Sequence, residues 1–164
     1  MARNEIEKLV AMLDEAYAGP AWHGPCLRGS LRGVTPGQAL WRPAPGRHNI
    51  WELAVHAAYW KYAVRRQLLG LKQGSFVEEG SNWFERGPRV AGGAAATAWR
   101  RGRAVLAREH EELRATVLPL GDSLLDFKPP GSRHTRRRMI AGVAFHDVYH
   151  AGQIQLVKRL AGTR

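Results

Sequence analysis

The sequence predicts an all-α fold, a bundle of four long helices joined by long crossover connections. Apolar residues recur at three- and four-residue spacings in four long blocks, which is typical of helices that bury one face. The stretches between these blocks are rich in Gly and Pro, and no stretch alternates as a strand does. A length of 164 residues suits one sizeable core, so we expect a single domain over residues 1–164.

The first two helices are predicted from their apolar faces and their ends. The first runs from about Arg3 to Tyr17 and ends before Gly19-Pro20. Its apolar face consists of Ile6, Leu9, Val10 and Leu13. A long connection follows, with at most a short helix near Leu27 to Val34. The second helix is predicted over Asn49 to about Leu69, because Asn49 followed by Glu52 resembles a capping box.

The last two helices are separated by long loops as well. A second long loop is predicted from Gly70 to Gly93, a third helix from about Ala94 to Leu118, and a fourth from about Thr135 to Ala161. Tight antiparallel bundles need links of only about 2 to 8 residues. We therefore expect at least one connection to cross the end of the bundle, so that the order is not simply up-down-up-down.

The fourth predicted helix carries polar side chains where a core is expected. Its packing seam reads Met139, Val143, His146, His150, Gln153, Val157 and Leu160. Histidines four residues apart lie one turn apart on one face, so both rings can reach a single ion. Polar groups on a core seam cost stability unless something satisfies them. A bound metal would do so, and the alternative is a pair of hydrogen-bonded core histidines.

The second predicted helix offers a third imidazole. His56 lies on the seam formed by Leu53, His56, Trp60 and Ala63, again among apolar groups. Bundle proteins build metal sites from side chains on facing helices. The pattern therefore favours one divalent ion held by His56, His146 and His150.

These two segments resemble a known family. HNIWELAVHAAYWKYAVRRQLLG and AFHDVYHAGQIQLVKRL are similar to the DinB-like family of four-helix metal-binding proteins, a superfamily that also contains bacillithiol- and mycothiol-dependent enzymes. The family's metal is held by one histidine on the second helix and an H-x-x-x-H pair on the fourth. The resemblance thus implies a DinB-like bundle with the same three ligands, His56, His146 and His150, across nearly the whole chain.

Further residues are candidates for roles beside the metal. Glu52 and Gln153 each lie one turn from a ligand, so either can hold a bound water or orient an imidazole. His23, in a Trp-His-Gly-Pro loop, can lean over the site as a general base, although loop histidines usually contact only solvent. His110 lies on the seam of the third predicted helix. Its possible roles are a fourth ligand, a hydrogen-bond partner of a ligand, or a structural or exposed histidine. Asp147 lies between the paired histidines but points off the seam.

The loops contribute aromatic side chains and the chain's single cysteine. The tryptophans of the long connections are Trp22, Trp41 and Trp83, and they either roof the site or cover exposed ends of the core. Cys26 is a weak candidate for a nucleophile, because a lone loop cysteine carries little information by itself.

Three histidines leave a coordination position open, which is the pattern of catalytic rather than structural metal sites. Neutral imidazoles suit zinc, nickel and iron(II) alike. An ion there can activate water or lower the pKa of a bound thiol. The resemblance implies transfer of a low-molecular-weight thiol to an electrophile. The alternatives are a metal-dependent hydrolase, with Glu52 or His23 as base, and a non-catalytic metal-binding protein of a stress response.

The net charge of +11 raises the question of nucleic acid as a partner. Basic residues cluster at 65–66, 100–103 and 136–138, but none of these clusters is interleaved with aromatics as a stacking surface would be. We expect a solvated surface and no sequence-specific nucleic-acid partner. Arginines near the mouth of the site can also attract an acidic small-molecule substrate, such as a thiol that carries carboxylates.

Location and assembly are predicted from weaker features. No apolar run approaches the roughly 20 residues that span a bilayer, and the N-terminus lacks a signal peptide's basic start. Cys26 has no partner for an internal disulfide, which suits the cytoplasm. The family resemblance, together with candidate exposed aromatics, predicts a homodimer.

Overall fold

Every regular element in the described part of the chain is a helix. The computed structural model describes residues 4–72, 74, 76–85 and 92–162. Four long helices form the bundle, namely α1 (Glu5–Tyr17), α4 (Ile50–Leu68), α5 (Gly92–Val117) and α6 (Arg136–Leu160). Shorter elements are α2 (Leu27–Ser30), α3 (Pro36–Leu40) and the 3₁₀ helix η1 (Asp122–Leu124). The predicted all-α class is confirmed.

The helices begin where the sequence places capping residues. Asn49 caps α4: its side chain accepts a hydrogen bond from the backbone N–H of Glu52 at 2.9 Å, and the Glu52 side chain accepts one from the Asn49 N–H. This is the predicted capping box. Thr135 caps α6 with its side chain alone, which accepts a hydrogen bond from the backbone N–H of Arg138 at 3.2 Å. The first helix, predicted from Arg3, begins at Glu5 with Asn4 as its cap, and Arg3 lies outside the described residues.

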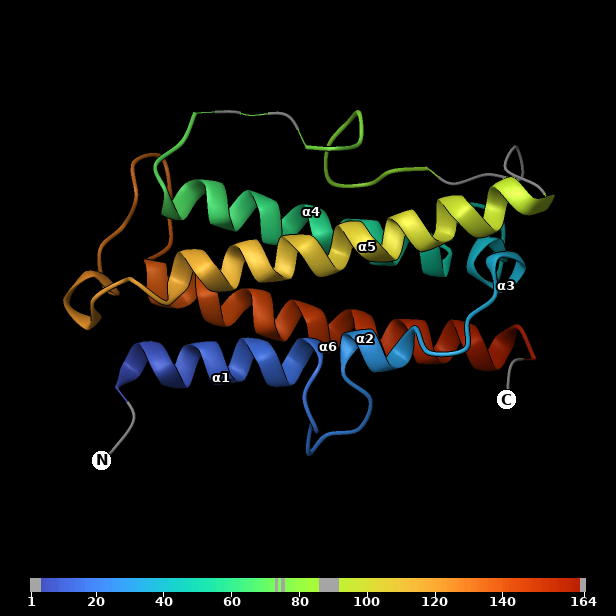
Figure 1. The fold of residues 1–164 in the computed structure, drawn as a ribbon, viewed down its shortest axis with the longest axis horizontal. Coiled ribbons are helices and arrows are strands. Elements are labelled where there is room, and N and C mark those ends of the chain that lie inside the picture. The colour runs from blue at the N-terminus through green and yellow to red at the C-terminus, as the bar shows by residue number, and fades with distance from the viewer. Residues whose placement is uncertain (1–3, 73, 75, 86–91, 163–164) are drawn as a thin grey trace.

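The order of the helices around the bundle departs from an up-and-down arrangement. α6 packs between α1 and α4, and α4 packs against α5. Figure 1 shows that α4 and α5, although consecutive, run in the same direction, so their connection has to return along the bundle. Residues 76–85 of this connection lie along α4, with the Phe76 and Phe84 ring centroids within 5.6 Å of that of Tyr59. The expected long crossover is confirmed.

Two apolar clusters fill the bundle, one toward each end. The cluster next to α2 and α3 includes Trp51, Leu106 and Ile154. The cluster at the opposite end, where α1 and η1 lie, includes Leu13, Leu113 and Ile140. None of the described helices combines the length and the apolar character that crossing a membrane requires.

A layer of polar side chains separates the two clusters. Each of three long helices contributes residues to both clusters and has one polar side chain between the two sets. These side chains are Lys61 of α4, His110 of α5 and Asp147 of α6. Lys61 and Asp147 form an ion pair whose side chains are 0% exposed. The three histidines singled out by the sequence lie at the level of this layer or within about two turns of it along their helices.

Candidate metal centre

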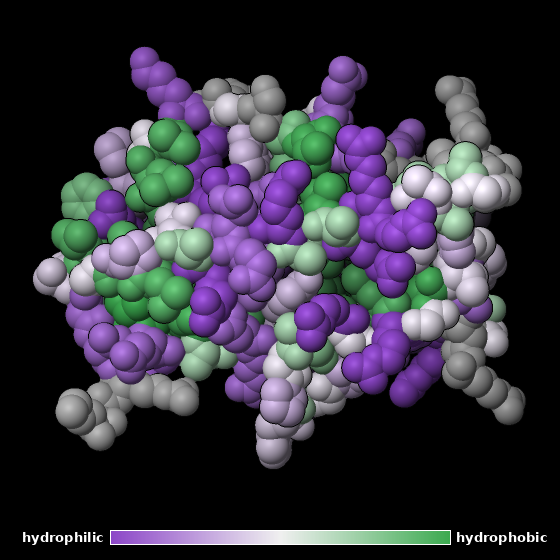
Figure 2. Space-filling view, in the orientation of Figure 1, coloured by the Kyte–Doolittle hydropathy of each residue, from purple (hydrophilic) through white to green (hydrophobic). Residues whose placement is uncertain are grey.

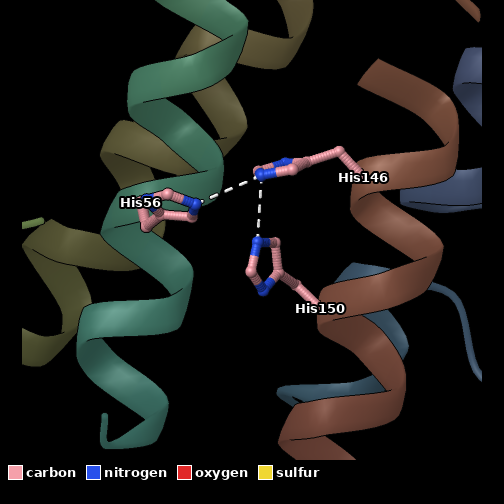
Figure 3. A group of neighbouring side chains, drawn as sticks. All are labelled: His56, His146 and His150. Atoms are coloured by element: carbon pink, nitrogen blue, oxygen red, sulfur yellow. Dashed lines mark hydrogen bonds between the residues drawn. The ribbon is translucent and has the colours of Figure 1, made fainter. Parts of the chain in front are cut away.

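The structure brings the three predicted ligands together. His56 projects from α4 toward α6, where His146 and His150 lie one turn apart, and the three rings point toward one another (Figure 3). The Nε2 atoms of His146 and His56 are 3.2 Å apart, and those of His150 and His146 are 3.0 Å apart. One nitrogen from each ring lies within 4.8 Å of the others. His56 and His150 are buried, and His146 is half-buried.

Hydrogen bonds at the outer nitrogens orient two of these rings. The Nδ1 of His56 lies 2.6 Å from the backbone carbonyl of Asn82. A carbonyl only accepts, so Nδ1 carries the hydrogen and the Nε2 lone pair of the neutral ring faces the centre of the group. The Nδ1 of His150 lies 2.6 Å from Oε1 of Gln153, with the same consequence for its Nε2. These are the partners that orient ligating histidines in metalloproteins.

Hydrogen bonding within the group cannot satisfy all three rings. The Nε2 lone pairs of His56 and His150 both face Nε2 of His146, which carries at most one hydrogen and can donate to only one of them. A cation shared by three lone pairs would satisfy all of them at once. The donor set and its geometry therefore fit a divalent metal ion, and the group could hold one.

The electrostatics keep the rings in the form that binds metal. Burial, followed by the neighbouring His150, His56 and Lys61, lowers the pKa of His146 to about 3. Burial lowers the pKa of His150 to about 4. It also lowers the pKa of His56, although the hydrogen bond to Asn82 opposes the shift. All three imidazoles are therefore neutral near pH 7, as ligands have to be.

A short segment of the crossover connection covers His56. Trp83 stacks on the His56 ring with a centroid distance of 3.7 Å and an interplanar angle of 6°, and its other face stacks on His48 at 3.6 Å. Asn82 has a positive φ of 63° and accepts a hydrogen bond from Trp60 Nε1 at 3.0 Å. Of the three loop tryptophans, which were expected either to roof the site or to cover exposed ends of the core, Trp83 covers the site, whereas Trp22 is 96% exposed and Trp41 is 36% exposed.

Glu52, predicted as a possible base, is engaged in an ion pair. Its buried carboxylate accepts hydrogen bonds from Arg42 and lies 3.1 Å from Nδ1 of His48. The carboxylate oxygens of Glu52 are thus occupied by Arg42 and by the backbone N–H of Asn49, which weakens the case for a general base. Glu52 reaches His56 indirectly, because His48 stacks on Trp83 and Trp83 stacks on His56. Gln153, in contrast, contacts the ligand His150 directly.

His23 and His110 lie elsewhere. His23 is exposed and lines a groove with Val148, Gly152 and Leu156, on a face of α6 that does not carry the paired histidines. His110 is buried on α5, where its ring stacks on Tyr17 at 4.0 Å and its Nε2 lies 3.1 Å from a carboxylate oxygen of Asp14. The structure does not bring either of them to the group of three.

Comparison with known proteins agrees with this architecture. A family model described as the DinB superfamily matches residues 26–154. The chain belongs to the DinB superfamily. The matched region begins just before α2 and ends within α6, so it includes all three histidines of the group. No curated protein and no solved structure matches the chain significantly. Membership of the DinB superfamily and the three-histidine group are together compatible with metal binding.

The sequence did not reveal the contacts that orient the group. Asn82 acts through its backbone carbonyl, which every residue has, so no side-chain pattern points to it. Trp83 was recognisable as an aromatic residue in a long loop, but its position between His48 and His56 depends on the path of the crossover. The one sequence feature that could have pointed to these contacts was the polar Asn82 next to an aromatic residue in a loop that contains both polar and apolar residues.

Proposed function

We propose that this DinB superfamily member is a metal-dependent enzyme that transfers a low-molecular-weight thiol to an electrophile. One divalent ion, zinc, nickel or iron(II), would be held by His56, His146 and His150. The observation that carries the proposal is the convergence of three Nε2 atoms, two of them on rings whose Nδ1 is tied to an acceptor. Three protein ligands leave a coordination position for a substrate.

The residues of the chain would prepare that position. When bound, a divalent ion supplies a Lewis acid that lowers the pKa of a thiol or water beside it. Asn82 and Gln153 hold two rings so that their lone pairs face inward. Trp83 covers one face of His56 and keeps water from that side of the ring. Fixed ligands of this kind reduce the reorganisation needed when the substrate binds.

Thiol transfer is preferred over hydrolysis because it needs no separate base at the site. The carboxylate of Glu52 is held by Arg42, and His23 lies on another face of α6. A thiol whose pKa is lowered by an ion can react as the thiolate directly. Two alternatives remain for the experiment to distinguish. One is hydrolysis with Glu52 or His23 as base, and the other is metal binding without catalysis in a stress response.

The test measures turnover with defined substrates. Protein loaded with zinc, nickel or iron(II) is mixed with monochlorobimane and a series of thiols, with and without carboxylates, and the fluorescent conjugate is followed. We expect His56→Ala to lower kcat/KM at least a hundredfold, and His134→Ala, an exposed histidine away from the group, to leave it unchanged. Full activity in His56→Ala would overturn the proposal.

Two further variants separate the alternatives. Ester hydrolysis without any thiol, lost in His23→Ala or Glu52→Gln, would favour the hydrolase. A bound ion without turnover of any thiol or ester would favour a non-catalytic metal-binding protein.

We also propose a homodimer. The outward face of α6 carries Phe145, Tyr149, Leu156 and Leu160, each 57–65% exposed, at spacings that place them along one side of the helix. A stripe of large apolar side chains is costly to leave in water and typical of an interface. Light scattering should give twice the 18.3 kDa chain mass, and Leu160→Glu should shift it toward the monomer. Leu118→Glu, exposed at the end of α5, is the control, and a wild-type monomer at micromolar concentrations would reject the dimer.

The partners would be small molecules in the cytoplasm rather than a specific nucleic acid. Some of the arginines are paired within the fold, since Arg65 pairs with Glu109, Arg114 with Asp14 and Arg137 with Glu5, and these pairs leave the net charge of +11 to act on any polyanion without regard to its sequence. Any DNA binding should fall steeply with added salt and show no sequence preference. A thousandfold preference for one sequence at physiological salt would contradict this.

A further inference from the structure

A cavity of about 560 Å³ opens among helices other than the two that carry the three histidines. It lies between the end of α1, the short helix α2 and the middle of α5. In Figure 2, which has the orientation of Figure 1, apolar surface is visible between hydrophilic side chains in the region of α2 and α5. Tyr17, Leu31 and Leu106 supply apolar surface to its wall. The volume lies within the roughly 300–1,000 Å³ of typical small-molecule sites.

Three arginines line this cavity, and no described carboxylate forms an ion pair with any of them. Arg28 and Arg32 come from α2 and its end, and Arg103 comes from α5. Within the described part of the chain, none of these guanidinium groups pairs with a carboxylate, unlike Arg65 and Arg137. Positive charge gathered around an apolar wall favours a ligand with the complementary pattern.

Two of the arginines are held in place by aromatic rings. The guanidinium carbon of Arg28 lies 6.0 Å from the centre of the Tyr17 ring, and that of Arg103 lies 5.6 Å from the Trp99 ring. Cation–π contacts of this kind restrict a long side chain without neutralising its charge. A planar guanidinium held this way can form two parallel hydrogen bonds to one carboxylate, phosphate or sulfonate group.

We propose that this cavity is a binding site for a small organic anion, a molecule with an apolar or aromatic body and an acidic group. The body would lie on Tyr17, Leu31 and Leu106, and the acidic group would be bound by the arginines. The site draws its residues from α1, α2 and α5, whereas the three histidines belong to α4 and α6. It is therefore distinct from the candidate metal centre and does not depend on its function.

Fluorescence titration with 8-anilinonaphthalene-1-sulfonate, an aromatic anion, tests the charge requirement. We expect one probe bound per chain, and a Kd about tenfold weaker in Arg28→Ala and in Arg103→Ala, because each loses a charge-assisted hydrogen bond. Arg101→Ala removes the same charge from α5 outside the cavity and should change Kd less than twofold. The neutral analogue N-phenyl-1-naphthylamine should bind at least tenfold more weakly.

The single cysteine locates the bound probe. Cys26 lines the cavity and is 8% exposed, and the sequence contains no other cysteine. Its thiolate attacks the disulfide of 5,5′-dithiobis(2-nitrobenzoate), forms a mixed disulfide and releases a coloured thiolate, so the rate is read directly. Saturating sulfonate probe should slow this reaction at least tenfold. The same protection is expected in protein stripped of metal and in His56→Ala, which separates this site from the proposed function.

Three results would overturn the proposal. One is equal affinity for the neutral analogue, which would mean that the charges are irrelevant. Another is an equal loss of affinity in Arg101→Ala, which would mean that only the overall charge matters. The third is an unchanged rate of Cys26 modification at saturation, which would place the probe elsewhere, for example on the apolar stripe of α6.

Thermal unfolding of each variant shows whether it remains folded. Arg103→Lys keeps the positive charge but lacks the planar guanidinium group that forms two parallel hydrogen bonds, so it should have an intermediate Kd.

Discussion

The bundle buries histidine in two places, and the surroundings give the same side chain two different roles. Between α4 and α6, His56, His146 and His150 turn their Nε2 atoms toward one another. Between α1 and α5, His110 turns its Nε2 toward the carboxylate of Asp14 and stacks on Tyr17. Burial lowers the pKa to about 4 for both His110 and His150.

A buried histidine with a depressed pKa is therefore not in itself a sign of a metal site. The direction of the lone pairs distinguishes the two regions. In the group of three, several acceptor atoms face one point and a cation would satisfy them. Around His110, Nε2 has a carboxylate partner and only Nδ1 lacks a hydrogen-bond partner among the described residues, so that region does not bring several lone pairs to one point.

The polar layer connects the two regions through Lys61. Its ammonium group pairs with Asp147, lies 5.3 Å from the Tyr17 ring, and is among the charges that lower the pKa of both His110 and His146. One buried cation thus helps to keep histidines of both regions neutral.

The largest effect should follow from removing a ligand. Wild-type protein should bind about one zinc ion per chain, and His150→Ala should bind it at least a thousandfold more weakly, because two imidazoles make a poor site. Elemental analysis and competition with a chromophoric chelator measure both quantities. His110→Gln provides the comparison and should keep full metal content. Equal metal in His150→Ala and wild type would show that the group of three is not the site.

Breaking the ion pair of the polar layer should be the next largest effect. Lys61→Met leaves the carboxylate of Asp147 buried without its cation, and burial already raises the pKa of that group. We expect the free energy of unfolding to fall by about 3–5 kcal/mol, measured by urea denaturation at pH 7. The double variant Lys61→Met/Asp147→Leu should recover most of this loss. No recovery would mean that packing around Lys61, rather than the stranded charge, determines the cost.

The pH dependence of stability should reveal His110. Its pKa is about 4 in the folded state, against 6.5 for an ordinary histidine, so the unfolded chain binds more protons between these pH values. Its contribution to stability is therefore present above pH 6.5 and is lost as the pH falls toward 4. His110→Phe should remove on the order of 3 kcal/mol of the acid-induced loss of stability, compared with the metal-free wild type. Parallel curves for the two proteins would contradict the assignment.

The smallest effect should come from the residue that covers His56. Trp83→Ala removes the stacked ring but none of the ligands, and the contacts that orient metal ligands typically contribute about tenfold or more to affinity. We expect zinc to bind about tenfold more weakly, measured by the same chelator competition. Trp22→Ala, whose side chain is 96% exposed, should bind zinc as the wild type does. If the two variants behave alike, the stack does not position His56.

Much of the fold and the core of the site could be predicted from local patterns. Apolar spacing and capping residues are properties of neighbouring residues, so the helices and the Asn49–Glu52 capping box followed from the sequence. The i,i+4 spacing of His146 and His150 places both on one face of any helix. His56 was recognisable because an imidazole on a second apolar seam needs a partner in the core.

Tertiary structure alone decided what surrounds those histidines. The carbonyl of Asn82 meets His56, and Trp83 stacks on it, only because the crossover between two parallel helices returns along α4. The pairing of Lys61 with Asp147, 86 residues apart, and the arginine-lined cavity between α2 and α5 also depend on how the helices are ordered around the bundle. Spacing along the chain determines which side chains share a helix face, whereas contacts between distant segments are determined by packing, which acts on the whole chain at once.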